Sequence, residues 1–233
     1  MFKKRNSETP FSSLEKTGKK GKYFEVKQSE NPDLIVKEMK AKWGRFEQKG
    51  VHPLNDIERL QADLDFLRNN FESYIPETSA VIGKNEDGKE VIYLIQHRIE
   101  GKGINDVQEK DRVINELKAF FEKVIQAMIK NLYYYGNEKW PRVTFPDLKG
   151  WNFIYGRDAK TRESDARLYF IDTYPVEGSD LEDFFARYFD LLKGTFKGVY
   201  WPVIDEFREK AKIEILNYIK SNKHQIRRVE STS

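Results

Sequence analysis

FPDLKGWNFIYG (residues 145–156) and RLYFIDTYP (residues 167–175) are the two stretches on which the interpretation of this sequence depends. The first places Asp147, Lys149 and Asn152 in a D-x-K-x-x-N array that runs into an apolar segment. The second ends its apolar run at Asp172. NFIYG and RLYFID predict a small hairpin, because both are rich in aromatic and β-branched residues and the ten residues between them are polar.

Composition limits the classes of protein that the chain can form. Its 233 residues are 39% hydrophobic and 14% aromatic, which suffices for the core of one large domain or two small lobes. The net charge is only +3, because 41 Lys and Arg nearly balance 38 Asp and Glu. Bulk charge therefore indicates neither a nucleic-acid nor a membrane partner.

Cysteine and histidine usage excludes further chemistry. The chain has no cysteine, so disulfides and thiolate nucleophiles are excluded, and its three histidines are too far apart for the familiar zinc signatures. The basic N-terminus lacks an apolar leader, and no apolar run is long enough to cross a bilayer. We therefore expect a cytoplasmic location.

The N-terminal part predicts a five-stranded antiparallel sheet beside one helix. Strand-like segments occur around residues 11–15, 23–28, 34–39, 78–83 and 90–99. TGKKGK (residues 17–22) predicts a turn, with Gly18 and Gly21 giving backbone freedom. From Asn55, a plausible N-cap, apolar residues recur at helical spacing up to Phe71.

The second half is typical of a helical lobe. EGKGIND (residues 100–106) predicts a linker, residues 109–135 predict a long helix, and two further helices are expected after Asp180. The predicted organisation is α+β: a flexible lead (1–10), a small lobe (11–99), a hinge (100–106), a helical lobe (107–222) and a flexible tail (223–233).

This order of parts, together with the D-x-K-x-x-N array and the Ile-Asp step that follows it, resembles the bilobal protein-kinase-like superfamily across nearly the whole chain. The resemblance implies that Asp147 orients or deprotonates an acceptor hydroxyl and that Lys149 meets the transferring phosphoryl group. It also implies that Asn152 and Asp172 hold magnesium and that the cofactors are ATP and Mg²⁺.

In the small lobe, the resemblance makes Lys37 the lysine that contacts the α- and β-phosphates of ATP. Its implied carboxylate partner is Glu58, with Glu47 as the reserve.

Two backbone segments of the small lobe complete the implied nucleotide site. Gly18 and Gly21 stand for a glycine loop, although their spacing departs from G-x-G-x-x-G and an ordinary basic hairpin is the alternative. Backbone groups from Gln96 to Arg98 would meet the adenine edge.

The sequence departs from the superfamily pattern at supporting positions. Phe145 stands where members usually have histidine, and Thr173 and Tyr174 follow Asp172 where many have Phe and Gly. No A-P-E sequence is present, and residues 175–180 lead almost at once into a helix. Docking of a protein substrate is therefore less favoured than a small molecule, as in kinases of the aminoglycoside or choline type.

The function implied is an ATP- and magnesium-dependent phosphotransferase that modifies the hydroxyl of an unidentified acceptor. The alternative is a pseudokinase, a nucleotide-binding or scaffold module with little turnover. A nucleic-acid binder using KKGK and IRR is disfavoured, because basic segments on a nearly neutral protein are usually solvated.

Acidic residues after the hairpin leave the acceptor open. They either favour a cationic substrate or mark the start of a helix, where carboxylates are stabilised, and we prefer the second explanation. These residues are Glu177, Asp180, Glu182 and Asp183.

Overall fold

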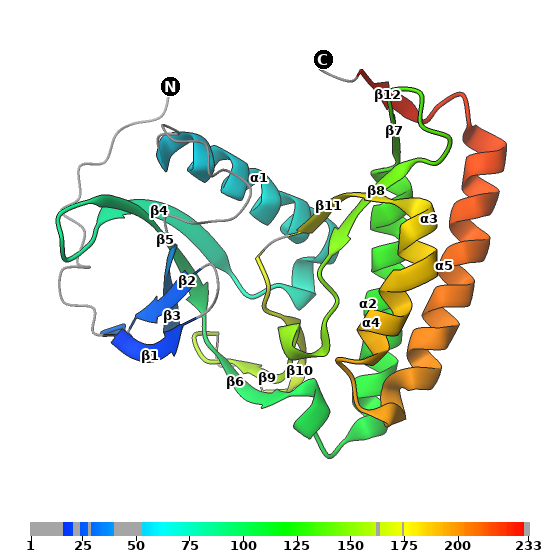
Figure 1. Ribbon diagram of the computed structural model, residues 1–233. Helices are drawn as coiled ribbons and strands as arrows, with labels where there is room; N and C mark the ends of the chain where they lie inside the picture. Colours follow the sequence, from blue (N-terminus) through cyan, green and yellow to red (C-terminus); the bar gives the residue numbers. More distant parts are fainter. Residues whose placement is uncertain are drawn as a thin grey trace. The chain divides into compact units, whose positions relative to one another are not determined.

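The structure is a computed structural model that describes residues 16–20, 24–27, 29–39, 53–161, 164–173 and 175–230. It is a mixed α and β protein, which confirms that part of the sequence prediction (Figure 1). The chain forms two compact units. The first comprises residues 1–64, 77–98 and 158–161, and the second comprises residues 65–76, 99–157 and 162–233.

The first unit contains a sheet of five strands in the order β1-β2-β3-β5-β4, and every neighbouring pair is antiparallel. Alternation of apolar and polar residues sets which side chains are buried, and Val36 and Tyr93 form a small core on this sheet. The strands are β1 (Lys16–Lys20), β2 (Phe24–Lys27), β3 (Leu34–Met39), β4 (Thr78–Lys84) and β5 (Glu90–His97).

Helix α1 (Pro53–Phe71) begins two residues before the predicted cap at Asn55. Proline is compatible with the first turn of a helix, because the N–H that it lacks has no partner there. Of the apolar residues predicted on one face of this helix, Leu60, Leu64, Leu67 and Phe71 are buried, whereas Ile57 is half-buried.

The second unit contains two small sheets. One has the order β10-β9-β6 and the other β11-β8-β7-β12. The hairpin predicted from NFIYG and RLYFID is confirmed, with Phe153 opposite Phe170 and Gly156 opposite Arg167. The strands are β6 (Ile99–Gly103), β7 (Tyr133–Tyr135), β8 (Arg142–Pro146), β9 (Phe153–Asp158), β10 (Arg167–Phe170), β11 (Pro175–Asp180) and β12 (Arg227–Val229).

Helix α2 (Lys110–Lys130) packs an aromatic face over the β9–β10 hairpin. The ring centroid of Phe120 lies 5.3 Å from that of Phe153 and 5.7 Å from that of Phe170. All three side chains are fully buried, so their removal from water is a large stabilising contribution to this unit.

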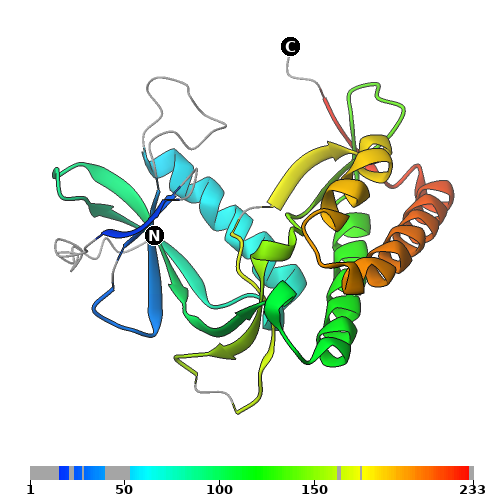
Figure 2. The same ribbon diagram turned by 60° about the horizontal axis from the view of Figure 1, so that its bottom comes forward.

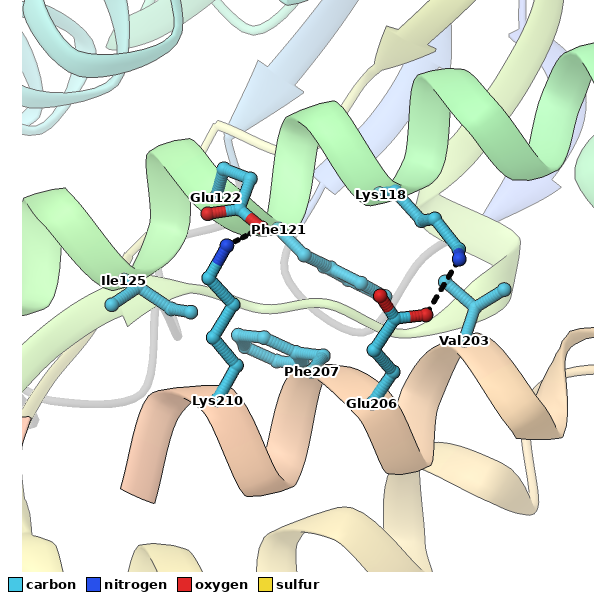
Figure 3. Close-up of a pocket in the computed structure, with 8 residues that line it drawn as sticks. All are labelled: Lys118, Phe121, Glu122, Ile125, Val203, Glu206, Phe207 and Lys210. Carbon is cyan, nitrogen blue, oxygen red and sulfur yellow. Dashed lines mark hydrogen bonds and ion pairs between the residues drawn. The ribbon is translucent and has the colours of Figure 1, made fainter. Parts of the chain in front are cut away.

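On its other side, α2 runs beside α5 (Trp201–Asn222), as both views show (Figures 1 and 2). Phe121 of α2 stacks on Phe207 of α5 with their ring centroids 4.3 Å apart. Figure 3 shows this stack between two ion pairs, Lys118–Glu206 and Lys210–Glu122. The hollow between the helices has a volume of only about 20 Å³, room for little more than one water, so it is a packing feature and not a ligand site.

Short helical segments connect these elements in the second unit. They are η1 (Glu72–Tyr74), η2 (Ile104–Asp106), η3 (Gly150–Asn152), α3 (Leu181–Asp183), η4 (Phe184–Tyr188), α4 (Phe189–Lys193) and η5 (Gly198–Tyr200). No helix in the described ranges is both long enough and apolar enough to cross a membrane.

Three expectations about backbone conformation are corrected. Gly18 lies inside β1 and not in a turn, whereas Gly21 and the strand expected at residues 11–15 lie outside the described residues. The expected linker at residues 100–106 forms β6 and η2. One of its glycines serves close packing: a Cβ on Gly101 would lie 2.2 Å from the carbonyl oxygen of Tyr155, so the close approach of β6 to β9 requires glycine at this position.

The third correction concerns two segments that pair with each other. The long helix ends at Lys130, and residues 133–135, expected to continue it, form β7. The expected tail contains β12, which pairs in parallel with β7. The guanidinium carbons of Arg227 and Arg228 lie over the rings of Tyr133 and Tyr134, at 5.3 and 4.9 Å from the centroids, which favours this pairing.

Candidate active site

The D-x-K-x-x-N array folds into a compact turn directly after β8. The backbone N–H of Lys149 donates to the carbonyl of Asp147 at 2.9 Å, and that of Asn152 donates to the carbonyl of Lys149 at 2.8 Å. These bonds close η3 over Gly150–Asn152. The three polar side chains of the array therefore start from one rigid piece of backbone.

Gly150 joins this turn to the segment after α4. Its N–H donates to Oγ1 of Thr195 at 2.9 Å, and a Cβ on Gly150 would lie 2.3 Å from the Thr195 carbonyl oxygen. That carbonyl also accepts a hydrogen bond from Nδ2 of Asn105 at 3.0 Å. Only a residue without a side chain allows this approach.

The side chains of the array lie close to Asp172, which is the second residue after the end of β10. Nδ2 of Asn152 donates to the carbonyl oxygen of Asp147 at 2.8 Å and to Oδ2 of Asp172 at 3.0 Å. Nζ of Lys149 lies 2.6 Å from Oδ2 of Asp147. The backbone N–H of Thr173 donates to Oδ1 of Asp172 at 2.7 Å. Four residues chosen from two separate stretches of sequence thus form one hydrogen-bonded cluster.

Pairing of β9 with β10 explains why Asp172 reaches the turn. The backbone N–H of Ile171 donates to the carbonyl of Asn152 at 2.9 Å, which extends the hairpin register by one bond. Asn152 and Asp172 therefore face each other across the start of the hairpin.

An aromatic cluster of Phe145, Phe184 and Tyr188 packs next to the turn. Phe145 is 1% exposed, and its ring centroid lies 4.8 Å from that of Phe184 and 4.9 Å from that of Tyr188. The hydroxyl oxygen of Tyr188 accepts the N–H of Leu148 at 2.9 Å. Packing of Phe145 and the hydrogen bond to Tyr188 therefore hold the turn in place.

The electrostatic surroundings of Tyr188 match this supporting role. Burial raises the pKa of its hydroxyl well above the ordinary value, the nearby carboxylates of Asp147 and Asp172 raise it further, and the bond from Leu148 lowers it. Tyr188 therefore stays protonated and neutral beside two carboxylates. The sequence analysis missed it, because FFARYF (residues 184–189) has the pattern of an ordinary helix-packing segment.

In the first unit, Lys37 lies in a buried chain of polar groups. Its Nζ donates to Oε1 of Gln96 at 3.1 Å, and Nε2 of Gln96 donates to Oγ1 of Thr78 at 3.0 Å. All three residues are less than 9% exposed. Gln96, predicted to act through its backbone, thus orients the lysine through its side chain.

The carboxylate assigned to Lys37 differs in burial from another on the same helix. Glu58 is exposed, whereas Asp63 is 7% exposed. Asp63 lies three residues after Leu60 and four before Leu67, so it shares the buried face of α1, and helical spacing could have identified it. Glu47, the reserve, lies outside the described residues.

The backbone donors predicted for an adenine edge are engaged inside the first unit. The N–H of His97 donates to the carbonyl of Glu77 at 2.9 Å, and the N–H of Arg98 donates to that of Asp33 at 2.8 Å. The carbonyl of Arg98 accepts the N–H of Ala159 at 2.9 Å. The N–H groups of residues 97 and 98 are therefore both used in bonds within this unit.

The oxygen donors of the cluster fit magnesium. Because the amide nitrogen of Asn152 is used in two hydrogen bonds, its amide oxygen is left to bind a cation beside the Asp172 carboxylate. Magnesium commonly takes one or two carboxylates and fills its remaining positions with water and substrate phosphates. The described residues include no set of three or more His, Cys, Asp or Glu side chains that could form a dedicated metal site.

One of the acidic residues after the hairpin, Asp180, has a structural role. Oδ1 of Asp180 accepts the N–H groups of Glu182 and Asp183 at 2.8 and 3.3 Å, so Asp180 is the N-cap of α3. This arrangement agrees with the preferred explanation, carboxylates at a helix start.

A larger cavity lies elsewhere in the second unit and contains no residue of the turn. It has a volume of about 300 Å³ and lies between the ends of α2 and α5 and the start of β12. Its lining residues are Ile129, Lys130, Asn131, Leu132, Tyr218, Gln225, Ile226 and Arg227.

Comparison with known proteins adds only distant likenesses of structure. No protein-family model matches the sequence, and no curated protein matches it either. One similar solved structure is the Rio2 kinase–ADP/Mg²⁺–phosphoaspartate complex from Chaetomium thermophilum. That chain is 12% identical, with a TM-score of 0.38, and the match covers 91% of the present chain and 72% of the other. At this distance the likeness assigns neither a family nor an activity to the chain.

Proposed function

We propose that the protein is an ATP- and magnesium-dependent phosphotransferase of the protein-kinase-like type, acting on the hydroxyl of a small-molecule acceptor. The observation that carries the proposal is the position of Asn152, whose amide nitrogen bridges the backbone of Asp147 and the carboxylate of Asp172. A proton acceptor and a cation-binding pair are thereby held at one turn.

In the proposed reaction, the acceptor hydroxyl oxygen bonds to the γ-phosphorus while the bond from that phosphorus to the β,γ-bridging oxygen breaks, and ADP leaves. The hydroxyl proton passes to the carboxylate of Asp147. The ammonium of Lys149, 2.6 Å from that carboxylate, offsets negative charge on the transferred group. No covalent enzyme intermediate is required.

Asp172 and the amide oxygen of Asn152 are the proposed magnesium ligands. When bound, Mg²⁺ neutralises charge on the β- and γ-phosphate oxygens. Both side chains are held before any ligand arrives, Asp172 by the N–H of Thr173 and Asn152 by two acceptors. Such preorganisation reduces the cost of ordering the site on binding.

Lys37 is the proposed contact for the α- and β-phosphates. Its bond to Gln96 holds the ammonium in one direction without neutralising it, because the amide is uncharged. We propose Asp63 in place of Glu58 as the carboxylate of α1 that serves this lysine, since a buried ammonium needs a buried partner. We also propose that the segment with Gly18 and Gly21 lies near the phosphates.

The alternative function is a nucleotide-binding scaffold with little turnover. Phe145 favours it, because an apolar ring stands where the superfamily usually has a polar support for the catalytic turn. Against it, every carboxylate and amide that the chemistry needs is present and connected.

The two functions are separated by two substitutions of the cluster, with ATP binding and turnover measured independently. We expect Asp172→Ala to abolish magnesium-dependent ATP binding in calorimetry. Asp147→Asn should preserve binding and lower phosphate transfer by about 10²- to 10⁴-fold, the usual contribution of a general base. Turnover is followed by mass spectrometry of phosphorylated products from metabolite pools.

Asp190→Asn is the matched control, because Asp190 is an exposed carboxylate of the same unit. It should leave both measurements unchanged. Binding without any transfer, and without an effect of Asp147→Asn, would establish the scaffold function. Absence of magnesium-dependent nucleotide binding in the unmodified protein would refute both.

A further inference from the structure

Trp151 is an exposed tryptophan within the candidate active site. It occupies η3 between Lys149 and Asn152, and 63% of its surface is exposed. Single exposed apolar residues are common on proteins, so exposure alone indicates nothing. The position of Trp151, on the turn that carries the proposed proton acceptor, is what distinguishes it.

The backbone that carries Trp151 is held in place. Gly150, its neighbour, is in contact with Thr195 through the N–H to Oγ1 bond of 2.9 Å and through the close approach of the two backbones. On the other side, Asn152 is held by its bonds to Asp147 and Asp172. The indole is therefore presented from a fixed turn, and burying it against a ligand costs little ordering of the chain.

The indole lies close to the proposed reacting group. Nζ of Lys149 is 5.7 Å from the ring centroid of Trp151 and 2.6 Å from Oδ2 of Asp147. Because both distances start from the same Nζ atom, the ring centroid of Trp151 lies no farther from Oδ2 of Asp147 than the sum of the two. A single small ring can therefore cover the indole and place one of its hydroxyls at Asp147.

The indole nitrogen supports a ligand-binding role. Trp201, also exposed, donates its Nε1 to the carbonyls of Lys193 and Phe196 at 3.1 and 3.3 Å. Within the described part of the chain, Nε1 of Trp151 has no such partner. Trp151 thus offers both a flat apolar face and a hydrogen-bond donor to a bound molecule.

Charge at the site selects the kind of acceptor. The ammonium of Lys149 lies over the indole, 5.7 Å from its centroid, so a cationic acceptor would have to displace it to take that cation–π position. A neutral ring that bears several hydroxyls has the matching groups. Its C–H face can cover the part of the indole that the ammonium leaves exposed, while one hydroxyl donates to Asp147 and another accepts from Lys149.

We propose that Trp151 is the platform on which the acceptor stacks, and that the acceptor is a neutral sugar or cyclitol. The inference rests on the proposed function and names its acceptor class. It disfavours cationic acceptors such as aminoglycosides and amino alcohols.

The test compares Trp151→Ala, Trp151→Phe and Trp140→Ala with the unmodified protein. Trp140 is a matched control, because it is half-buried in the same unit and also lies under a lysine, with Nζ of Lys139 5.9 Å from its ring centroid. Probes are glucose, ribose and myo-inositol as neutral acceptors, and kanamycin and choline as cationic ones. Binding of each probe is measured by saturation-transfer NMR without nucleotide, and KM and kcat are measured with MgATP.

We expect at least one neutral probe to bind and to be phosphorylated. Trp151→Ala should raise its KM about three- to tenfold with a smaller change in kcat, in proportion to the energy of one aromatic contact. Trp151→Phe should restore most of the affinity, and Trp140→Ala should match the unmodified protein.

The inference is overturned if only the cationic probes bind, if no probe binds, or if Trp151→Ala and Trp140→Ala have the same effect. These outcomes differ from failure of the proposed function, because ATP binding and its dependence on Asp172 are measured separately. A protein that binds MgATP but none of the neutral probes would disprove this inference alone.

Discussion

Gly150 is the residue on which the shape of the candidate active site depends most directly. A methyl group at this position would meet the carbonyl oxygen of Thr195 at 2.3 Å, well inside contact distance. Because the obstacle is backbone, it cannot rotate away, and the turn or the segment after α4 must shift.

We therefore expect Gly150→Ala to destabilise the protein by about 1–3 kcal/mol, the range typical of overpacking. The rate of phosphate transfer should also fall, and by more than the loss of folded protein explains, because Asp147, Lys149 and Asn152 all start from the shifted backbone. Urea unfolding and transfer rate are the two measurements. Gly198→Ala is the control, since nothing lies within 4 Å of the added carbon, and an equal effect of both substitutions would contradict the prediction.

At the residue scale, the sequence predicted which polar groups meet but not what holds them. The spacing of Asp147, Lys149, Asn152 and Asp172 indicates one site, because a hairpin returns the chain to its start. The contacts of Tyr188 and Thr195 could not be predicted, since they join segments 40 and 45 residues apart by single hydrogen bonds. The burial of Asp63, which we propose as the carboxylate for Lys37, could have been predicted from helical spacing.

At the scale of elements, β12 is the part of the chain for which the structure changes the expectation most. Three residues pair with β7, the carbonyl of Val229 accepts the N–H of Gly136 at 2.8 Å, and two arginines lie over tyrosine rings. A frayed tail would make none of these contacts.

Removal of residues 227–233 should lower the free energy of unfolding by about 1–2 kcal/mol, since two cation–π contacts contribute roughly 0.5–1 kcal/mol each at exposed sites. The measurement is urea unfolding of the shortened chain. Removal of residues 231–233 alone serves as the control and should change nothing. Equal stability of both chains would show that β12 contributes nothing to the fold.

Elements that bury a continuous apolar face were predictable, and strands that depend on distant partners were not. Helix α1 and the β9–β10 hairpin follow from hydrophobic spacing, because each buries a continuous face. Strands β6, β7 and β12 have three to five residues each and are formed by pairing with distant partners. Local propensity carries little information about such strands.

At the scale of the whole molecule, buried tyrosines make the free energy of unfolding depend on pH in the alkaline range. Burial is the main cause that raises the pKa of Tyr200 in the second unit to about 12, and also that of Tyr93 in the first unit to about 12. An unfolded tyrosine has a pKa of about 10. Between these values the unfolded chain loses protons that the folded protein retains, so the free energy of unfolding falls as pH rises.

We expect this fall to begin near pH 10 and to continue to about pH 12. Tyr200→Phe should make the fall shallower, and the double variant with Tyr93→Phe shallower still, although each loses stability at neutral pH with its hydroxyl bond. Urea unfolding at a series of alkaline pH values checks this. A slope that is the same in all three proteins would rule out these hydroxyls as its source.

The division of the chain into two units also limits where the chain can be cut into fragments that keep a unit whole. The chain passes from one unit to the other at residues 64–65, 76–77, 98–99, 157–158 and 161–162. A fragment ending at Arg98 would contain the buried His97 but not Asp158, whose Oδ2 lies 2.8 Å from its Nδ1. Neither unit corresponds to a continuous gene segment, so recombination between related genes at a single point could not exchange one unit and leave the other whole.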